Sequence, residues 1–551
     1  MRIAIAQLNP IVGDLAGNRA QVVEAAARAA EEGADLLVAP ELVLTGYPPM
    51  DLLGRTGFVD AQLRELDALA EASKQVPIVL GAVIRAPGGA GKRLWNAGVV
   101  LAGGERVAVR PKSLLPTYDV FDEKRYFSRA TEREPVALGA DTAPFGIAVC
   151  EDTWVDRVDY DVDPVRELRD QGVSLVLNPS ASPWHAGKAA ERRQMFQQLA
   201  KKNGVALVFV NQVGGNDELI FDGGSCAIDA RGEVLASLPL FEPDFQVVDI
   251  PDSDDEKAST TGLRVTDPSP VEQLETGLVV GIRDYFEKQN LPPGAVIGLS
   301  GGIDSAVTAY LAVRALGADR VLGVAMPGPY SSGHSVDDAL ELGRLLDIEV
   351  RTANIRGVYE SYRSLFGELF GERDDYGLTQ QNIQSRIRGA VLMAVSNQEN
   401  RLVLATGNKS ELSVGYCTLY GDTVGGLAVL GDVYKRDVYA LAVHANRVRP
   451  QIPKNTIEKP PSAELAPDQL DTDDLPSYDI LDAVLEQAIE GAQGREAVRP
   501  PAGASQESAR AIVGRLDRNE YKRRQTPLVL RTSPKAFGSG RRLPIVHRFE
   551  G

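Results

Sequence analysis

Residues 296–305 combine the residue types of an anion-binding turn, Val-Ile-Gly-Leu-Ser-Gly-Gly-Ile-Asp-Ser, and an apolar helical pattern follows at 306–316. A glycine-rich turn between a strand and a helix directs several backbone N–H groups and the positive end of the helix at one point, where phosphate commonly binds. Gly301 and Gly302 let the backbone approach such a ligand closely. The Asp304 carboxylate could hold a magnesium ion carried by the phosphates. The alternative is an ordinary turn in which glycine serves only for tightness.

Three residues at the ends of expected strands of the first half could form a nucleophilic site: Glu41, Lys112 and Cys150, the last of which closes a strand expected at 147–150. A free thiol has a pKa of about 8.5, and the two acidic residues directly after Cys150 disfavour the thiolate, so this cysteine needs a base. Glu41 could take the thiol proton, and Lys112 could stabilise the oxyanion of a tetrahedral intermediate. Singly, each residue also has an ordinary structural explanation, and His185 offers a rival Cys–His pairing.

Composition narrows the classes of function. The chain has 551 residues, enough for two or more domains, and a formal net charge of −17, which argues against nucleic acid as a partner. Three cysteines lie far apart without a CxxC pair (Cys150, Cys226 and Cys417), which excludes a disulfide framework and suits a reducing compartment. No signal peptide or membrane-spanning run is recognisable, so we expect a soluble cytoplasmic protein with no membrane partner.

The elements that position these residues form two α/β patterns. In the first half, strand-like runs outnumber helices, which indicates layered sheets covered by helices. In the second half, strands expected at 296–300, 321–325, 349–353 and 401–405 alternate with helices, as in a doubly wound parallel sheet. Ligands of such sheets bind beyond the carboxyl ends of the strands, where the turn at 300–305 falls.

An acidic, turn-rich segment separates the two patterns. We therefore expect a first domain at 1–250, a linker at 251–270 and a second domain at 271–551. Residues 455–477 are rich in Pro and Asp and are expected to form a mobile loop.

Motifs of the first half resemble the nitrilase superfamily, and more closely its glutaminase members. They are Pro-Glu-Leu-Val-Leu-Thr-Gly-Tyr-Pro at 40–48, Arg-Pro-Lys-Ser-Leu-Leu-Pro at 110–116 and Cys-Glu-Asp at 150–152. The resemblance implies an αββα sandwich in which Glu41, Lys112 and Cys150 form a Glu-Lys-Cys triad and the cysteine forms a thioester. It also implies four glutamine contacts: Tyr118, Glu123, Ser182 and Lys188.

In the second half, Ser-Gly-Gly-Ile-Asp-Ser at 300–305 resembles the loop of ATP pyrophosphatases, which transfer AMP and release pyrophosphate. Further stretches are similar to NAD synthetases: 381–388, 405–411, 420–422, 431–435, 459–465 and 522–525. Both sets together resemble glutamine-dependent NAD synthetases over nearly the whole chain.

This resemblance implies a carbon–nitrogen ligase with ATP as co-substrate and Mg²⁺ as cofactor. Deamido-NAD would become an acyl-adenylate, and ammonia from glutamine would convert it to NAD, giving AMP, pyrophosphate and glutamate. The implied ATP contacts are Gly298, Leu299, Ser300, Gly301, Gly302, Ile303, Asp304, Ser305, Thr406 and Lys435. The implied deamido-NAD contacts are Asn382, Glu411, Tyr416, Cys417, Thr418, Leu419 and Lys522, and magnesium would lie on Asp304 and Glu411.

The family also implies a homo-oligomer. Ammonia is largely protonated in neutral water, so a sheltered passage between the two sites is expected.

Two other interpretations stay open: a nitrilase-like hydrolase with a nucleotide-sensing second domain, and a non-catalytic ATP-binding scaffold. Taken alone, Asn382 and Arg386 could be surface positions of one helix, and 522–524 a solvated run of charge.

Overall fold

The computed structural model describes residues 1–87, 94–139, 142–155, 158, 160–251 and 262–549. The chain divides into two compact units, Met1–Pro268 and Ser269–Gly551. Of the predicted linker, residues 252–261 lie outside the described residues. Among the described helices, none is long and apolar enough to cross a membrane.

Two sheets form the centre of the first unit. The six-stranded sheet has the order β13-β1-β2-β3-β4-β5, and the five-stranded sheet has the order β12-β11-β8-β7-β6. The strands of the first sheet are β1 (Arg2–Gln7), β2 (Leu36–Val38), β3 (Ile78–Arg85), β4 (Leu94–Ala102), β5 (Glu105–Pro111) and β13 (Asp244–Asp249). Those of the second are β6 (Gly146–Ile147), β7 (Leu175–Ser180), β8 (Ala206–Asn211), β11 (Cys226–Ile228) and β12 (Val234–Ser237), and a hairpin adds β9 (Val213–Asn216) and β10 (Leu219–Asp222).

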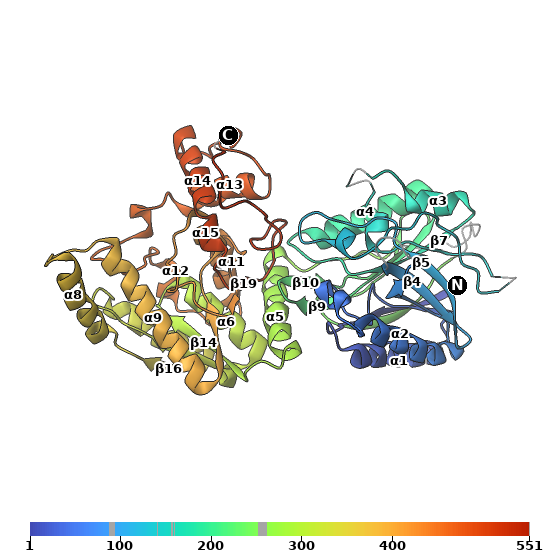
Figure 1. The fold of residues 1–551 in the computed structure, drawn as a ribbon, viewed down its shortest axis with the longest axis horizontal. Coiled ribbons are helices and arrows are strands. Elements are labelled where there is room, and N and C mark those ends of the chain that lie inside the picture. The colour runs from blue at the N-terminus through green and yellow to red at the C-terminus, as the bar shows by residue number, and fades with distance from the viewer. Residues whose placement is uncertain (88–93, 140–141, 156–157, 159, 252–261, 550–551) are drawn as a thin grey trace. The chain divides into compact units, whose positions relative to one another are not determined.

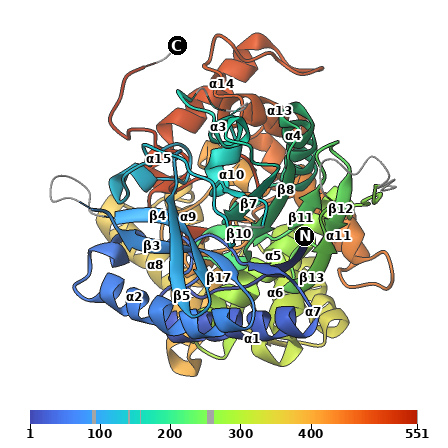
Figure 2. The same ribbon diagram turned by 90° about the vertical axis from the view of Figure 1, so that its right-hand side faces the viewer.

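Strand alternation explains how this unit is layered. In β1, Ile3 and Ile5 pack between the two sheets against Leu177 and Val208, whereas Ala4 and its neighbours on the other face pack against helices. Helices α1 (Leu15–Glu31) and α2 (Phe58–Leu69) cover the first sheet, and α3 (Pro164–Asp170) and α4 (Lys188–Asn203) cover the second (Figures 1 and 2). The predicted αββα sandwich is confirmed.

The second unit contains a six-stranded sheet of order β16-β15-β14-β17-β18-β19, with every neighbouring pair parallel. Its strands are β14 (Gly294–Leu299), β15 (Val321–Ala325), β16 (Glu349–Thr352), β17 (Arg401–Ala405), β18 (Leu427–Ala428) and β19 (Leu528–Val529). The order runs outward in both directions from β14 and β17, so a crevice opens where the two directions diverge. The predicted doubly wound parallel sheet is confirmed.

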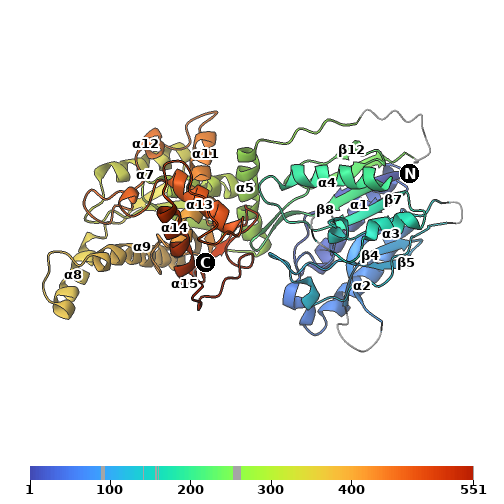
Figure 3. The ribbon, with the colours of Figure 1, turned by 90° about the horizontal axis from the view of Figure 1, so that it is seen from above.

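Helices cover both faces of this sheet. Val296 of β14 packs with Ile387 and Leu392 of α9 (Leu378–Glu399), and α8 (Arg356–Phe370) lies beside α9. The opposite face carries α6 (Ile303–Leu316), which contacts α5 (Pro270–Lys288) and α11 (Lys435–Ala445) (Figure 1). Helices α5 and α11 also contact each other (Figure 3). The remaining helices are α7 (Gly333–Leu346), α10 (Lys409–Val414), α12 (Lys454–Glu458), α13 (Tyr478–Ile489), α14 (Gln506–Arg518) and α15 (Glu520–Arg523).

One expected strand is shorter than its sequence pattern indicates. The run that ends at Cys150 is a strand only over β6, Gly146–Ile147, and Cys150 instead begins a short 3₁₀ helix, Cys150–Thr153. Cys150 has a φ of 42°, which an extended strand cannot accommodate. The nucleophile candidate therefore sits on a turn and not at the end of a strand.

Candidate active sites

The first candidate site is a buried cluster of charged groups around Lys112. The Lys112 Nζ donates to Glu41 Oε1 at 2.8 Å and to Glu123 Oε1 at 2.8 Å. Burial alone would lower the pKa of Lys112, but the charges of Glu123 and Glu41 raise it well above its ordinary value. Lys112 is thus a cation shared by two carboxylates, which suits it to stabilise a developing oxyanion.

Cys150 completes this cluster. Burial raises the pKa of its thiol, and the Glu41 charge raises it further, while Lys112 opposes the shift. The resting sulfur is therefore a thiol that needs a base in order to attack. The backbone N–H of Ala181 donates to Glu41 Oε2 at 3.0 Å, which fixes the carboxylate beside the thiol.

Asp152 ties the nucleophile turn to the segment that carries Lys112. Its carboxylate accepts the backbone N–H groups of Ser113 at 3.0 Å, Leu114 at 2.7 Å and Val149 at 3.0 Å. Three donors on one buried carboxylate hold the two segments in a single geometry.

Three of the predicted glutamine contacts, Tyr118, Ser182 and Lys188, have hydrogen-bond partners outside this cluster. Tyr118 is partly exposed, and its Oη donates to Glu151 Oε1 at 2.8 Å. Ser182 is buried, and its backbone N–H donates to Asn211. Lys188 donates to the Pro183 carbonyl at 2.6 Å and lies 5.3 Å above the ring of Trp154.

Glu123 differs from the other predicted glutamine contacts. It is buried, and it also accepts the Tyr47 hydroxyl at 3.0 Å. Burial raises the pKa of Glu123 to about 7, although Lys112 opposes the shift. Its contacts make it a member of the charged cluster around Lys112.

The second candidate site is a cavity of about 590 Å³ at the crevice between β14 and β17. The turn after β14 contributes Ser300, Gly302 and the start of α6 to its lining. All the predicted ATP and deamido-NAD contacts line this cavity except Gly301 and Leu419.

Gly301 and Leu419, which do not line the cavity, contact other segments through their backbone atoms. Gly301 has a φ of 75° and lies so close to Ser335 that a Cβ would meet its carbonyl oxygen at 2.4 Å. Glycine is required there because the turn packs against α7. The Leu419 carbonyl accepts the Arg386 Nε at 3.2 Å.

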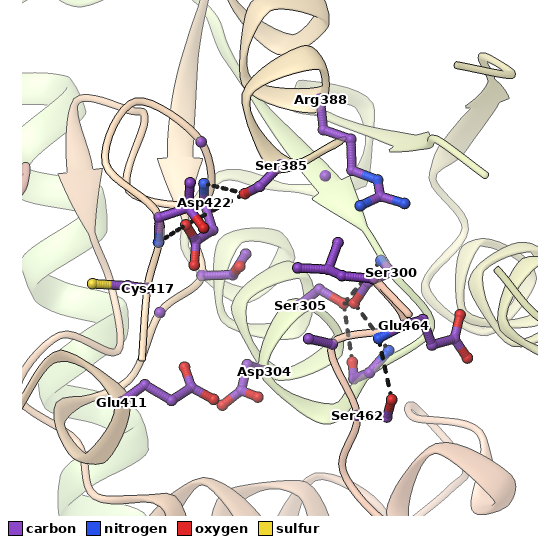
Figure 4. A pocket seen from close by; sticks show the side chains of 18 of the residues that line it. Ser300, Asp304, Ser305, Ser385, Arg388, Glu411, Cys417, Asp422, Ser462 and Glu464 are labelled. Carbon is purple, nitrogen blue, oxygen red and sulfur yellow. Dashed lines mark hydrogen bonds between the residues drawn. The ribbon is translucent and has the colours of Figure 1, made fainter. Parts of the chain in front are cut away.

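Asp304 and Glu411 converge on one cation. The Lys435 Nζ donates to Asp304 Oδ2 at 2.6 Å and to Glu411 Oε1 at 3.2 Å, and Figure 4 shows the two carboxylates turned toward each other. Burial raises the pKa of Glu411 to about 8, with Lys435 opposing and Asp304 adding to the shift. Asn408 donates to Asp304 Oδ1 at 2.8 Å.

This donor set fits magnesium together with a nucleotide. Among the described residues, no group of three or more His, Cys, Asp or Glu is placed to hold a metal by itself. Magnesium is usually bound by one or two carboxylates plus phosphate oxygens, and Asp304 and Glu411 supply that pair beside the anion-binding turn.

The predicted deamido-NAD contacts cluster around the loop after α10. Asn382 accepts the Thr418 hydroxyl at 2.9 Å, and the Lys522 Nζ donates to the Cys417 carbonyl at 2.7 Å. Asp422 accepts the Thr418 backbone N–H at 2.6 Å. Burial raises the pKa of Asp422 to about 6.

Segment 455–477, expected to be a mobile loop, has defined contacts along the rim of the cavity. Glu464 accepts the hydroxyls of Ser332 at 3.0 Å and Ser335 at 2.6 Å, and Thr456 donates to the Gly301 carbonyl at 3.3 Å. Figure 4 shows Glu464 near the turn that carries Ser300.

Several residues of the two sites were not singled out from the sequence. Asn408 had a recognisable signal, because Asn followed three residues later by Glu forms the capping box that begins α10. Arg388 lines the cavity and falls within a motif already noted, but nothing in the sequence indicates that its half-buried side chain faces this cavity. Asn96 interrupts the otherwise apolar strand β4, and a polar residue in such a run is a signal in itself.

Comparison with known proteins assigns both units. The family profile described as carbon-nitrogen hydrolase matches residues 2–257, and the profile described as NAD synthase matches residues 275–526. A glutamine-dependent NAD(+) synthetase of Synechocystis sp. is 44% identical over 558 residues, covering 99% of each chain. The chain belongs to the glutamine-dependent NAD(+) synthetase family.

Other members of the family agree with this assignment. The synthetase of Thermotoga maritima is 38% identical over 585 residues, covering 100% of this chain and 99% of its own. The structure of the Acinetobacter baumannii glutamine-dependent NAD+ synthetase, solved in complex with ADP, matches with a TM-score of 0.76 and 36% identity over 99% of this chain and 98% of that chain. The protein is a ligase with glutamine as amide donor, with a nitrilase-type glutaminase domain and an NAD synthase domain.

Proposed function

We propose that the glutaminase domain works through a thioester on Cys150. Glu41 removes the thiol proton, the sulfur attacks the side-chain carboxamide of glutamine, and the Lys112 ammonium stabilises the resulting oxyanion. The C–N bond then breaks, and the proton held by Glu41 passes to the leaving ammonia. Water, activated by Glu41, hydrolyses the thioester to glutamate and restores the thiol. Tyr118, Ser182 and Lys188 would hold the glutamine, with Glu123 acting through Lys112.

We propose that the second domain activates deamido-NAD with ATP. The turn at 298–305 and Thr406 hold the nucleotide, and Lys435 reaches its phosphates. Asp304 and Glu411 would hold Mg²⁺, which offsets negative charge on the departing pyrophosphate. The substrate carboxylate displaces pyrophosphate to give an acyl-adenylate, and ammonia then displaces AMP to give NAD.

The expected contacts to deamido-NAD are those that line the cavity near Thr418. They are Asn382, Glu411, Tyr416, Cys417, Thr418 and Lys522, with Leu419 adjoining through its backbone.

The observation that carries the proposal is the convergence of Asp304 and Glu411 on Lys435 directly beside the anion-binding turn. Purified protein supplied with ATP, Mg²⁺, deamido-NAD and amide-labelled glutamine should yield labelled NAD together with AMP by mass spectrometry. Cys150→Ala should lose synthesis from glutamine and recover it with ammonium. If ammonium fails to restore synthesis, the division of labour between two sites is wrong.

We also propose that the active form is a homo-oligomer. Helix α8 exposes Val358, Tyr362, Leu365 and Leu369, which are spaced four, three and four residues apart and so form one apolar stripe. Such a stripe suits association with a second copy. Light scattering should give a mass above that of one chain, and Leu365→Glu with Leu369→Glu should lower it.

A further inference from the structure

A buried amide, Asn96, contacts both carboxylates of the Lys112 cluster. Its Nδ2 donates to Glu41 Oε1 at 2.6 Å and approaches Glu123 Oε2 at 3.4 Å. Asn96 is fully buried on β4, and its backbone carbonyl accepts the Lys112 N–H at 2.8 Å. The same residue thus fixes the backbone of Lys112 and touches the two groups that share its ammonium.

The chemistry of its neighbours sets the orientation of this amide. Glu41 Oε1 also accepts from the Lys112 ammonium, so it is an acceptor and the Asn96 NH₂ must face it; the opposite orientation would place the amide oxygen against the Glu41 carboxylate. Among the described residues, the Asn96 Oδ1 has no hydrogen-bond partner. An apolar residue would avoid that unsatisfied oxygen, so packing alone does not account for asparagine here.

The charges around Glu41 explain what the amide contributes. Lys112, Glu123 and Cys150 all face Glu41, and Lys112 is the only cation among these groups. One cation cannot neutralise two carboxylates in a buried site, so one of them tends to take a proton. The Asn96 Nδ2 lies closer to Glu41 Oε1, at 2.6 Å, than to Glu123 Oε2, at 3.4 Å, so its hydrogen bond favours the charge of Glu41.

We infer that Asn96 is a positioning residue of the glutaminase site, whose side-chain amide keeps Glu41 ionised as the proton acceptor and directs the shared proton to Glu123. This inference rests on the proposed role of Glu41 as the base for Cys150. Tyr47, which donates to Glu123 at 3.0 Å, completes the hydrogen bonds of the second carboxylate.

The test is the pH profile of glutamate release by the full-length protein. In Asn96→Leu, loss of a hydrogen bond to a charged group should move the acidic limb of the profile upward by about one pH unit. Below that limb kcat should fall about tenfold, with KM little changed. Asn96→Asp keeps the shape of the side chain but adds a third negative charge, so its limb should move further in the same direction.

Gln62→Leu is the matched control. Gln62 is also a fully buried amide of this unit, makes one hydrogen bond to the Val83 N–H, and has an unpaired Nε2 among the described residues. The Gln62→Leu variant should have a lower thermal stability than wild type, but the acidic limb of its pH profile should not move. The rate of Cys150 alkylation, followed on its peptide by mass spectrometry, should shift with pH as the limb does.

If the acidic limb of the pH profile does not move in Asn96→Leu and Asn96→Asp, while AMP formation from ammonium is intact, the inference is wrong. The proposed function would still stand. The same shift in Gln62→Leu would also overturn it. A wild-type protein that releases no glutamate from glutamine would instead refute the proposed function, and the inference with it.

Discussion

Lys409 is a fully buried cation that holds the end of the second unit in place. Its Nζ contacts Asp432 at 2.8 Å, Glu490 at 2.7 Å, the Ser533 hydroxyl at 2.6 Å and the Lys535 carbonyl at 2.9 Å. In Lys409→Met these partners lose their common donor, and breaking a buried ion pair costs about 3–5 kcal/mol.

The structure places the expected loss at the lower end of that range. Asp432 keeps three other donors, the backbone N–H groups of Thr532 at 2.8 Å and Ser533 at 2.7 Å and the Ser533 hydroxyl at 2.9 Å. We therefore expect a loss of about 3 kcal/mol, a large fraction of the 5–15 kcal/mol that stabilises a typical domain.

Hydrogen exchange is the suitable assay, because a two-unit chain has no single unfolding free energy. Amides of 428–433 and 528–537 should lose protection in Lys409→Met, while those of the first unit and glutamate release stay unchanged. AMP formation should fall, because the adjacent Asn408 positions Asp304. Lys454→Met, at an exposed lysine, is the control and should change little. Protection within about 1 kcal/mol of wild type would refute this reasoning, since a buried pair is expected to contribute more.

Three further predictions concern single charges. Asp304→Asn should reduce AMP formation at least about a hundredfold with glutamate release intact, because Lys435 loses a carboxylate partner and the proposed magnesium site loses a ligand; both products can be measured in one reaction. Glu123→Gln should lower kcat for glutamate release by about a hundredfold, because Lys112 loses one of its two partners, without changing AMP formation from ammonium. The raised pKa of Asp422, about 6, lies above its unfolded value of about 3.9, so its contribution to stability is full below pH ~4 and lost as pH rises through 6. The melting temperature of Asp422→Asn should therefore fall less than that of wild type over this interval, and an equal fall would contradict the assignment.

Much of the architecture could be predicted because regular patterns carry it. The runs at 321–325 and 401–405 coincide with β15 and β17, and the turn at 300–305 falls at the crevice of the sheet. These segments are short, apolar and bounded by turn residues, so local pattern and final structure agree.

Other features depend on contacts between distant residues. Glu123 was expected to contact glutamine, and nothing in its irregular segment indicated that Lys112 would be its partner. Cys150 follows an apolar run, but its φ of 42° is set by the turn that Asp152 ties to Leu114. Periodicity cannot report such long-range hydrogen bonds.

The two sites use the same arrangement of one lysine between two carboxylates, but with different exposure. Lys112 lies 2.8 Å from both Glu41 and Glu123, whose side chains are 0% and 5% exposed. Lys435 lies 2.6 Å from Asp304 and 3.2 Å from Glu411, whose side chains are 18% and 16% exposed and face a cavity. The buried cluster around Lys112 keeps its charges in a fixed arrangement, which is what stabilisation of an oxyanion requires. In the cluster around Lys435, Asp304 and Glu411 are accessible from the cavity. These two carboxylates can therefore exchange their contacts with the lysine for contacts with a metal and phosphates.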